Sequence, residues 1–268
     1  MSQDPIAQFA REKAEKIATY PSQRDWHALS NQWMQQAFDQ RYMYHFSWMG
    51  RPIIQTPNDM VALQEIIWAV KPDLIIETGI AHGGSLILSA SLLALLDEAE
   101  AVANRTTVDP RASKRKVIGI DIDIRSHNRA AIESHPMAHR IQMIEGSSIA
   151  PEMLAKVKAA AAGYKNILVC LDSHHTHDHV MEELKAYTPF VTVGSYCLVY
   201  DTVVEDMPKS TFPDRDWAPG NNPKTAVWEF LKAQQQAPKN QPQFEIDRTI
   251  DDKLMITAAP QGWLKRIG

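Results

Sequence analysis

Polar side chains that can bind ligands or move protons follow several short apolar runs in this sequence. The apolar runs are typical of buried strands, and they alternate with helical patterns. Such alternation predicts a parallel sheet, in which ligands bind at the carboxyl ends of the strands. We therefore expect one site built from these ends. The polar residues found there are Glu77, Asp121, Asp123, Ser147, Asp172, His175 and Asp201.

Glycine is scarce in the chain, with 11 glycines against 16 prolines, yet three glycines fall between Glu77 and Ser85. They follow a predicted strand and open a predicted helix, which is the setting of a nucleotide-binding turn. The spacing of Gly79, Gly83 and Gly84 fits neither the dinucleotide fingerprint nor a Walker A loop. The acid Glu77 ahead of the turn would repel phosphate and would suit a cation.

A second cluster, Asp172 to His179, contains four histidines. A zinc site is one interpretation, but neither an H-E-x-x-H motif nor paired cysteines accompany it. Asp172 and Asp201 end neighbouring predicted strands, and paired carboxylates there suit Mg²⁺. The alternative for both residues is N-capping of the elements that follow them. His175 lies at the same edge of the sheet.

The order Glu-x-Gly-x-x-x-Gly from Glu77 to Gly83 resembles the first motif of class I S-adenosylmethionine-dependent methyltransferases. The resemblance implies that the glycine turn contacts the amino-acid part and the ribose of that methyl donor. It also implies that Asp121 holds the ribose hydroxyls, with Asp123 as the fallback. The full set of expected donor-binding residues is Glu77, Thr78, Gly79, Gly83, Ser85, Asp121, Asp123, Ser147 and Asp172.

A more specific resemblance, from about residue 40 to the end, is to the cephalosporin hydroxylase family. It is carried by the stretches 44–53, 73–201, 219–227 and 254–266. Members of that family have the class I methyltransferase fold, and characterised relatives include sugar O-methyltransferases. The resemblance implies a magnesium ligand at Asp172, a base at His175 and oligomeric assembly. Metal-dependent relatives carry two adjacent acids where this chain has Tyr200 and Asp201, so only Asp201 is carried over as a second ligand.

For the fold, we expect an α/β, Rossmann-like, doubly wound and mostly parallel sheet of seven strands. Residues 1–56 should form a helical and aromatic extension, and residues 57–268 a methyltransferase domain with a lid-like loop at 203–223. Within these, we expect an extended segment at 42–48 with four aromatic side chains on one face. We also expect a helix from Asn58, with Asn58 as its cap, and a terminal antiparallel hairpin of residues 244–250 and 254–257.

Composition limits the function further. With 44% apolar residues and a net charge of -4, the chain can fold into a globular protein and offers no basic surface for nucleic acid. It lacks a signal-peptide pattern and a membrane-length apolar run, so we expect a cytoplasmic protein without a membrane span. Cys170 and Cys197 should be buried thiols.

We therefore predict methyl transfer from S-adenosylmethionine to a hydroxyl of a small molecule or saccharide, with Mg²⁺ assisting, by a homo-oligomer. Two alternatives stay open from the sequence. One is a non-catalytic, cofactor-binding partner of a biosynthetic hydroxylase. The other is a nicotinamide oxidoreductase, which the glycine spacing disfavours.

Overall fold

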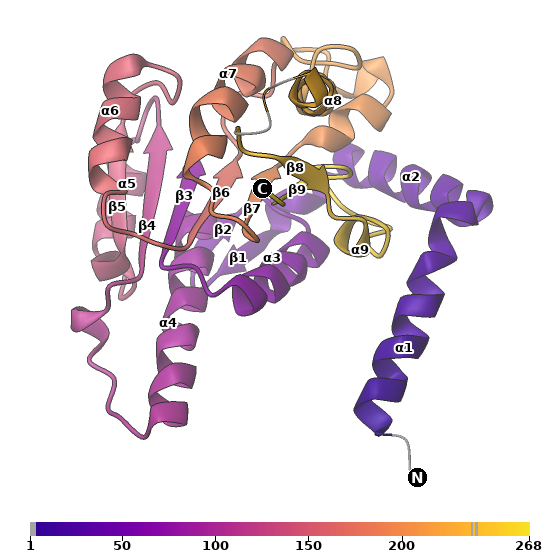
Figure 1. The fold of residues 1–268 in the computed structure, drawn as a ribbon. Helices are drawn as coiled ribbons and strands as arrows, with labels where there is room; N and C mark the ends of the chain where they lie inside the picture. Colours follow the sequence, from indigo (N-terminus) through magenta and orange to yellow (C-terminus); the bar gives the residue numbers. More distant parts are fainter. Residues whose placement is uncertain (1–3, 237, 239–240) are drawn as a thin grey trace.

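A seven-stranded sheet forms the centre of the computed structural model, which describes residues 4–236, 238 and 241–268 (Figure 1). The strand order is β5-β4-β3-β6-β7-β9-β8. The first five strands in this order pair in parallel, whereas β9 runs antiparallel to both β7 and β8. The strands are β3 (Leu74–Thr78), β4 (Lys116–Asp121), β5 (Ile141–Glu145), β6 (Ile167–Leu171), β7 (Tyr196–Val199), β8 (Phe244–Ile246) and β9 (Trp263–Arg266). This confirms the predicted fold class.

Alternate strand residues point to opposite faces of the sheet, and in the central strands the residues on both faces are buried. Helices therefore cover both faces. Ile75 joins one apolar core with α3 (Pro57–Val70), α4 (Gly84–Asn104) and α5 (Ser126–Glu133). Its neighbours Leu74 and Ile76 join a second core with α6 (Pro151–Ala160), α7 (His177–Tyr187) and α8 (Pro223–Gln236). Cys170 and Cys197 are free, buried thiols, as predicted.

The N-terminal extension begins with α1 (Pro5–Ala18) and α2 (Arg24–Asp39), and α1 projects away from the body of the molecule (Figure 1). The predicted extended segment at 42–48 is wrong in its first half. Arg41 takes a left-handed conformation, and residues 42–45 form a 3₁₀ turn. Only β1 (Phe46–Trp48) is extended, and it pairs with β2 (Arg51–Ile53). The four aromatic side chains therefore do not share one face.

Two further predictions need correction. The helix predicted from Asn58 begins at Pro57, because proline suits the first helical position, and Thr56 is its cap. Asn58 instead donates its side-chain amide to the carbonyl of Ile256. The predicted second hairpin strand at 254–257 is also wrong: a short helix, α9 (Arg248–Asp251), intervenes, and the strand that pairs with β8 is β9.

The segment 203–223 is irregular, as predicted, and is tied to neighbouring elements. Its two 3₁₀ turns cover Thr202–Asp206 and Lys209–Thr211. Glu205 accepts hydrogen bonds from the backbone N–H of Gly220 (2.7 Å) and from the side-chain amide of Asn222. The buried Lys224 of α8 pairs with Asp206 at 2.5 Å. In the described part of the chain, no helix is both long and apolar enough to cross a membrane.

Candidate active site

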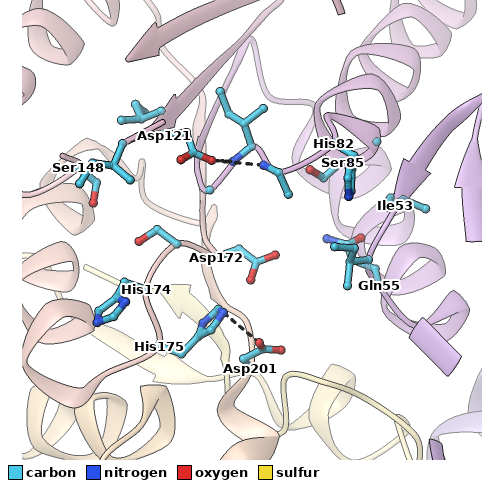
Figure 2. A pocket seen from close by; sticks show the side chains of 18 of the residues that line it. Ile53, Gln55, His82, Ser85, Asp121, Ser148, Asp172, His174, His175 and Asp201 are labelled. Carbon is cyan, nitrogen blue, oxygen red and sulfur yellow. Dashed lines mark hydrogen bonds and ion pairs between the residues drawn. The ribbon is translucent and has the colours of Figure 1, made fainter. Parts of the chain in front are cut away.

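A cavity of about 580 Å³ opens at the carboxyl ends of the parallel strands. It brings together residues that lie far apart in the sequence (Figure 2). Seven of the residues predicted from the sequence line it: Gly79, Ser85, Asp121, Ser147, Asp172, His175 and Asp201. Four others do not line it: Glu77, Thr78, Gly83 and Asp123.

The glycine turn connects β3 to α4 and depends on close backbone contacts. Gly79 has φ +88°, and a Cβ there would lie 1.9 Å from the carbonyl oxygen of Asp172. Gly83 has φ +83° and precedes α4 without a side-chain cap. Only glycine combines these conformations with this closeness. The turn therefore lies directly against the end of β6.

Asp121 holds the glycine turn from the cavity side. Its Oδ2 accepts hydrogen bonds from the backbone N–H groups of Ile80 (2.8 Å) and Ala81 (3.3 Å). Figure 2 shows these bonds beside the open space of the cavity. Asp123 is exposed, and its carboxylate lies 4.0 Å from Arg125. Of the two acids considered for ribose binding, the cavity therefore includes Asp121.

Glu77 is buried beneath the glycine turn, with 3% of its surface exposed. Burial raises the pKa of its carboxyl to about 7, and the hydrogen bond donated by Ser85 only partly offsets this. Thr78 is fully buried next to it. These two residues support the floor of the cavity and do not form its surface.

The second half of the cavity contains a cluster of Asp172, His175 and Asp201. One ligand atom from each lies within 4.8 Å of the others. His175 Nε2 is 3.1 Å from Asp201 Oδ2. Burial raises the pKa of Asp172 well above its usual range, and the negative charge of Asp201 adds to this effect.

Neither carboxylate acts as a helix cap. Asp201 precedes a 3₁₀ turn but makes no capping hydrogen bond. The residue in the cap position of α7 is Thr176, not Asp172. The capping alternative is therefore wrong for both acids. Within the described residues, nothing donates a hydrogen bond to the carboxylate of Asp172, which faces the cavity (Figure 2).

The other three histidines between Asp172 and His179 make polar contacts outside the group of Asp172, His175 and Asp201. His174 Nε2 lies 3.1 Å from Asp216, and His177 contacts Thr225 and Glu229 of α8. His179 Nε2 lies 3.1 Å from the hydroxyls of both Ser148 and Ser173. Among the described residues, the one group of three metal-ligating side chains close enough to share an ion is Asp172, His175 and Asp201. This grouping does not favour the histidine-rich zinc site.

Tyr200, next to Asp201, points into the protein core. It is 3% exposed, and its ring packs edge-on against Trp263 with centroids 6.4 Å apart. Its hydroxyl has no partner among the described residues. Burial raises the pKa of this phenol well above its usual range. Tyr200 therefore offers no carboxylate beside Asp201, and its hydroxyl is buried.

Several cavity residues were missed from the sequence. Gln55, His82 and Ser148 line the cavity; His82 occupies a variable position of the glycine motif, and no motif includes Gln55 or Ser148. Trp217 reaches His175 from the irregular segment, with ring centroids 4.9 Å apart. Tyr44 also lines the cavity, and its place in an aromatic-rich stretch was the one available signal.

The sheet order, the glycine turn and the site at the strand ends define a protein with the class I methyltransferase fold. Solved structures agree on the fold. The structure described as cmcI-D160 Mg-SAM aligns with a TM-score of 0.54 and 16% identity, over 84% of this chain and 78% of that one. An O-methyltransferase from Bacillus cereus in complex with SAH aligns with a TM-score of 0.50 and 12% identity, over 89% of this chain and 90% of that one.

The chain belongs to the rhamnosyl O-methyltransferase/CmcI family, whose model matches residues 40–267. It is similar to the rhamnosyl O-methyltransferase of Mycobacterium leprae (strain TN), with 28% identity over 163 residues, which are 60% of this chain and 62% of that protein. It is also similar to the rhamnosyl O-methyltransferase of Mycobacterium bovis (strain BCG / Pasteur 1173P2), with 25% identity over 224 residues. These residues are 82% of this chain and 78% of that protein.

Proposed function

We propose that this protein transfers a methyl group from S-adenosylmethionine to a hydroxyl of a sugar or natural product. The observation that carries the proposal is the joining of two half-sites in one cavity, the glycine turn with Asp121 and the cluster of Asp172, His175 and Asp201. Family membership supports it, since the relatives named above are rhamnosyl O-methyltransferases.

The first half-site fits the methyl donor. Asp121 is a carboxylate at the cavity surface, and ribose hydroxyls are good donors to such a group. The start of α4 offers backbone N–H groups without a side-chain cap, and these suit the carboxylate of an amino acid. We assign the remaining donor contacts to Gly79, Ser85 and Ser147, with Glu77, Thr78 and Gly83 supporting them from below.

The second half-site fits a magnesium ion. Two carboxylates facing the same space form a donor set of the kind that Mg²⁺ prefers, with water or substrate oxygens completing the shell. Asp172 has no hydrogen-bond partner for its carboxylate in the described structure, and its pKa is raised by burial first and by the negative charge of Asp201 second. A cation would relieve this repulsion. Asp172 and Asp201 are therefore the proposed ligands.

The donor supplies an electrophilic methyl group, and a bound cation makes the acceptor hydroxyl more acidic. The residues of this chain then have two tasks. His175 accepts the hydroxyl proton at a ring nitrogen, while Asp201, 3.1 Å away, orients the ring and stabilises its charged form. The cavity holds donor and acceptor in line, which supplies much of the rate enhancement for a displacement of this kind.

Two variants test this assignment. Asp172→Asn and His175→Ala should each lower kcat by about 100-fold or more, the first by weakening the site of the Lewis-acidic cation and the second by removing the positioned proton acceptor. Both should bind S-adenosylhomocysteine within about threefold of the wild type, measured by calorimetry, because they belong to the acceptor half. Loss of that binding with equal loss of turnover would instead place them in the donor half.

We also propose roles for the larger parts. Residues 57–268 form the methyltransferase domain, residues 1–56 form an extension that mediates homo-oligomer assembly, and the segment 203–223 acts as a lid over the acceptor. The exposed apolar side chains of α1 support assembly, since Ile6 is 79% and Phe9 68% exposed. Trp217 supports the lid, because it lies beside His175.

A further inference from the structure

A small hairpin of the N-terminal extension reaches the glycine turn. Its strands, β1 and β2, are joined at Met49 (φ +46°) and Gly50 (φ +83°), a two-residue turn of the kind that gives tight hairpins. The hairpin lies against the first turns of α4, where Trp48 Nε1 donates to Ser91 Oγ at 2.9 Å. A Cβ on Gly84 would lie 2.2 Å from the carbonyl oxygen of Pro52.

Arg51 of this hairpin binds the backbone of the glycine turn. Its Nε and Nη2 both donate to the carbonyl oxygen of His82, at 3.0 Å and 2.6 Å. Nη2 also donates to Asn128 Oδ1 at 3.0 Å. Asn128, a buried residue of α5, in turn donates to the carbonyl oxygen of Ala81 at 2.9 Å. Two successive carbonyls are thus held by one connected pair of side chains.

The turn needs such support because it is strained. Ala81 has φ +45°, a left-handed conformation that is unfavourable for a residue with a Cβ. Asp121 binds the N–H groups of Ile80 and Ala81 on the other side of the same turn. Acceptors on one side and donors on the other therefore fix the backbone that lines the cavity. Strain of this kind persists only where the surroundings over-determine it.

We propose that Arg51 and Asn128 are positioning residues that hold the Ala81–His82 turn in the conformation that binds the methyl donor. The inference rests on the proposed function and extends the donor site to the N-terminal extension. The two side chains act through the backbone of the turn, since neither lines the cavity. Removing either one frees a carbonyl and lets the turn relax.

The test is calorimetry of S-adenosylhomocysteine binding to the full-length protein. Arg51→Met and Asn128→Ala should each weaken binding at least tenfold, and Arg51→Lys should recover part of the loss. The donor KM should rise by a similar factor with kcat changed less than threefold. Hydrogen exchange at residues 80–83 should become faster. Arg111→Met, an exposed site away from the turn, is the matched control and should bind as the wild type does.

Thermal melting shows whether each variant is folded before its binding is compared. If Arg51→Met is unstable, a folded Asn128→Ala protein still tests the positioning role. If both variants bind S-adenosylhomocysteine as tightly as the wild type and hydrogen exchange at residues 80–83 is unchanged, the positioning role is overturned. The proposed function would stand. Failure of the wild-type protein to bind S-adenosylhomocysteine would overturn the proposed function and this inference together.

Discussion

Among single residues, Glu77 is a carboxyl that burial keeps protonated to an unusually high pH. Its pKa of about 7 in the folded protein exceeds the ordinary glutamate value of 4.5. The native state therefore keeps a proton over a pH range in which the unfolded chain has lost it. The resulting contribution to stability is complete below about pH 4.5 and is lost as the pH rises through 7.

Glu77→Gln should remove the part of the pH dependence that this carboxyl contributes, while Asp172, whose pKa burial also raises, keeps its own part. The wild-type protein should lose about 3 kcal/mol of unfolding free energy through this group between pH 4.5 and 8. Asp59, whose pKa burial raises to about 6, should keep a smaller slope of the same sign in the variant. Urea denaturation across this pH range measures the effect. An unchanged slope in Glu77→Gln, matching that of the exposed Glu152→Gln, would contradict the assignment.

At the scale of elements, the site depends on how closely the β3 turn approaches the end of β6. Gly79 allows this approach, and the two half-sites meet there. Gly163 also has a left-handed φ, at +92°, but nothing lies within 4 Å of the position where its Cβ would be. An alanine at position 163 would therefore meet backbone strain only, whereas an alanine at position 79 would meet both backbone strain and a steric clash.

Gly163→Ala should cost about 1 kcal/mol, the expected strain for alanine in that conformation. Gly79→Ala should cost the same strain and also push the turn away from Asp172, for a total of about 3–5 kcal/mol. Denaturant unfolding compares the two variants. Equal losses would show that the space against the Asp172 carbonyl, 1.9 Å from where a Cβ of residue 79 would lie, does not constrain the native structure.

Part of this architecture could be predicted from the sequence. The buried strands can be predicted because short, almost wholly apolar runs are typical of strands covered on both faces. The polar residues at the ends of these runs indicate the site. The run at 254–257 was not a strand because its backbone is held by α3: the carbonyl of Ile256 accepts from Asn58, and the N–H of Ala258, just after the run, donates to Asp59. Gln55 and Arg51 had no local signal, since their roles come from contacts with distant segments.

At the scale of the whole molecule, α1 is the least embedded element. None of its described residues is buried, and a helix of 14 residues is marginally stable alone in water. Its apolar side chains lie toward one side, which is typical of a helix that packs on a partner. A second copy of the chain is the partner proposed above.

Phe9→Asp should therefore shift the protein toward the monomer mass of 30.2 kDa in analytical ultracentrifugation. The wild-type protein should sediment as a multiple of that mass. Gln8→Asp introduces a similar charge about 100° further around the helix, on its polar side, and should leave the assembly unchanged. A monomeric wild-type protein would contradict the role proposed for the extension.

The central claim is methyl transfer to a hydroxyl at the cavity formed by the glycine turn and the Asp172 cluster. The most direct measurement is mass spectrometry of sugar and natural-product acceptors incubated with the purified protein, Mg²⁺ and a donor labelled in its methyl group. We expect an acceptor heavier by one labelled methyl in place of one hydrogen, and we expect this product to depend on Asp172. Donor binding without methylation of any hydroxyl acceptor, or methylation that Asp172→Asn leaves unchanged, would contradict it.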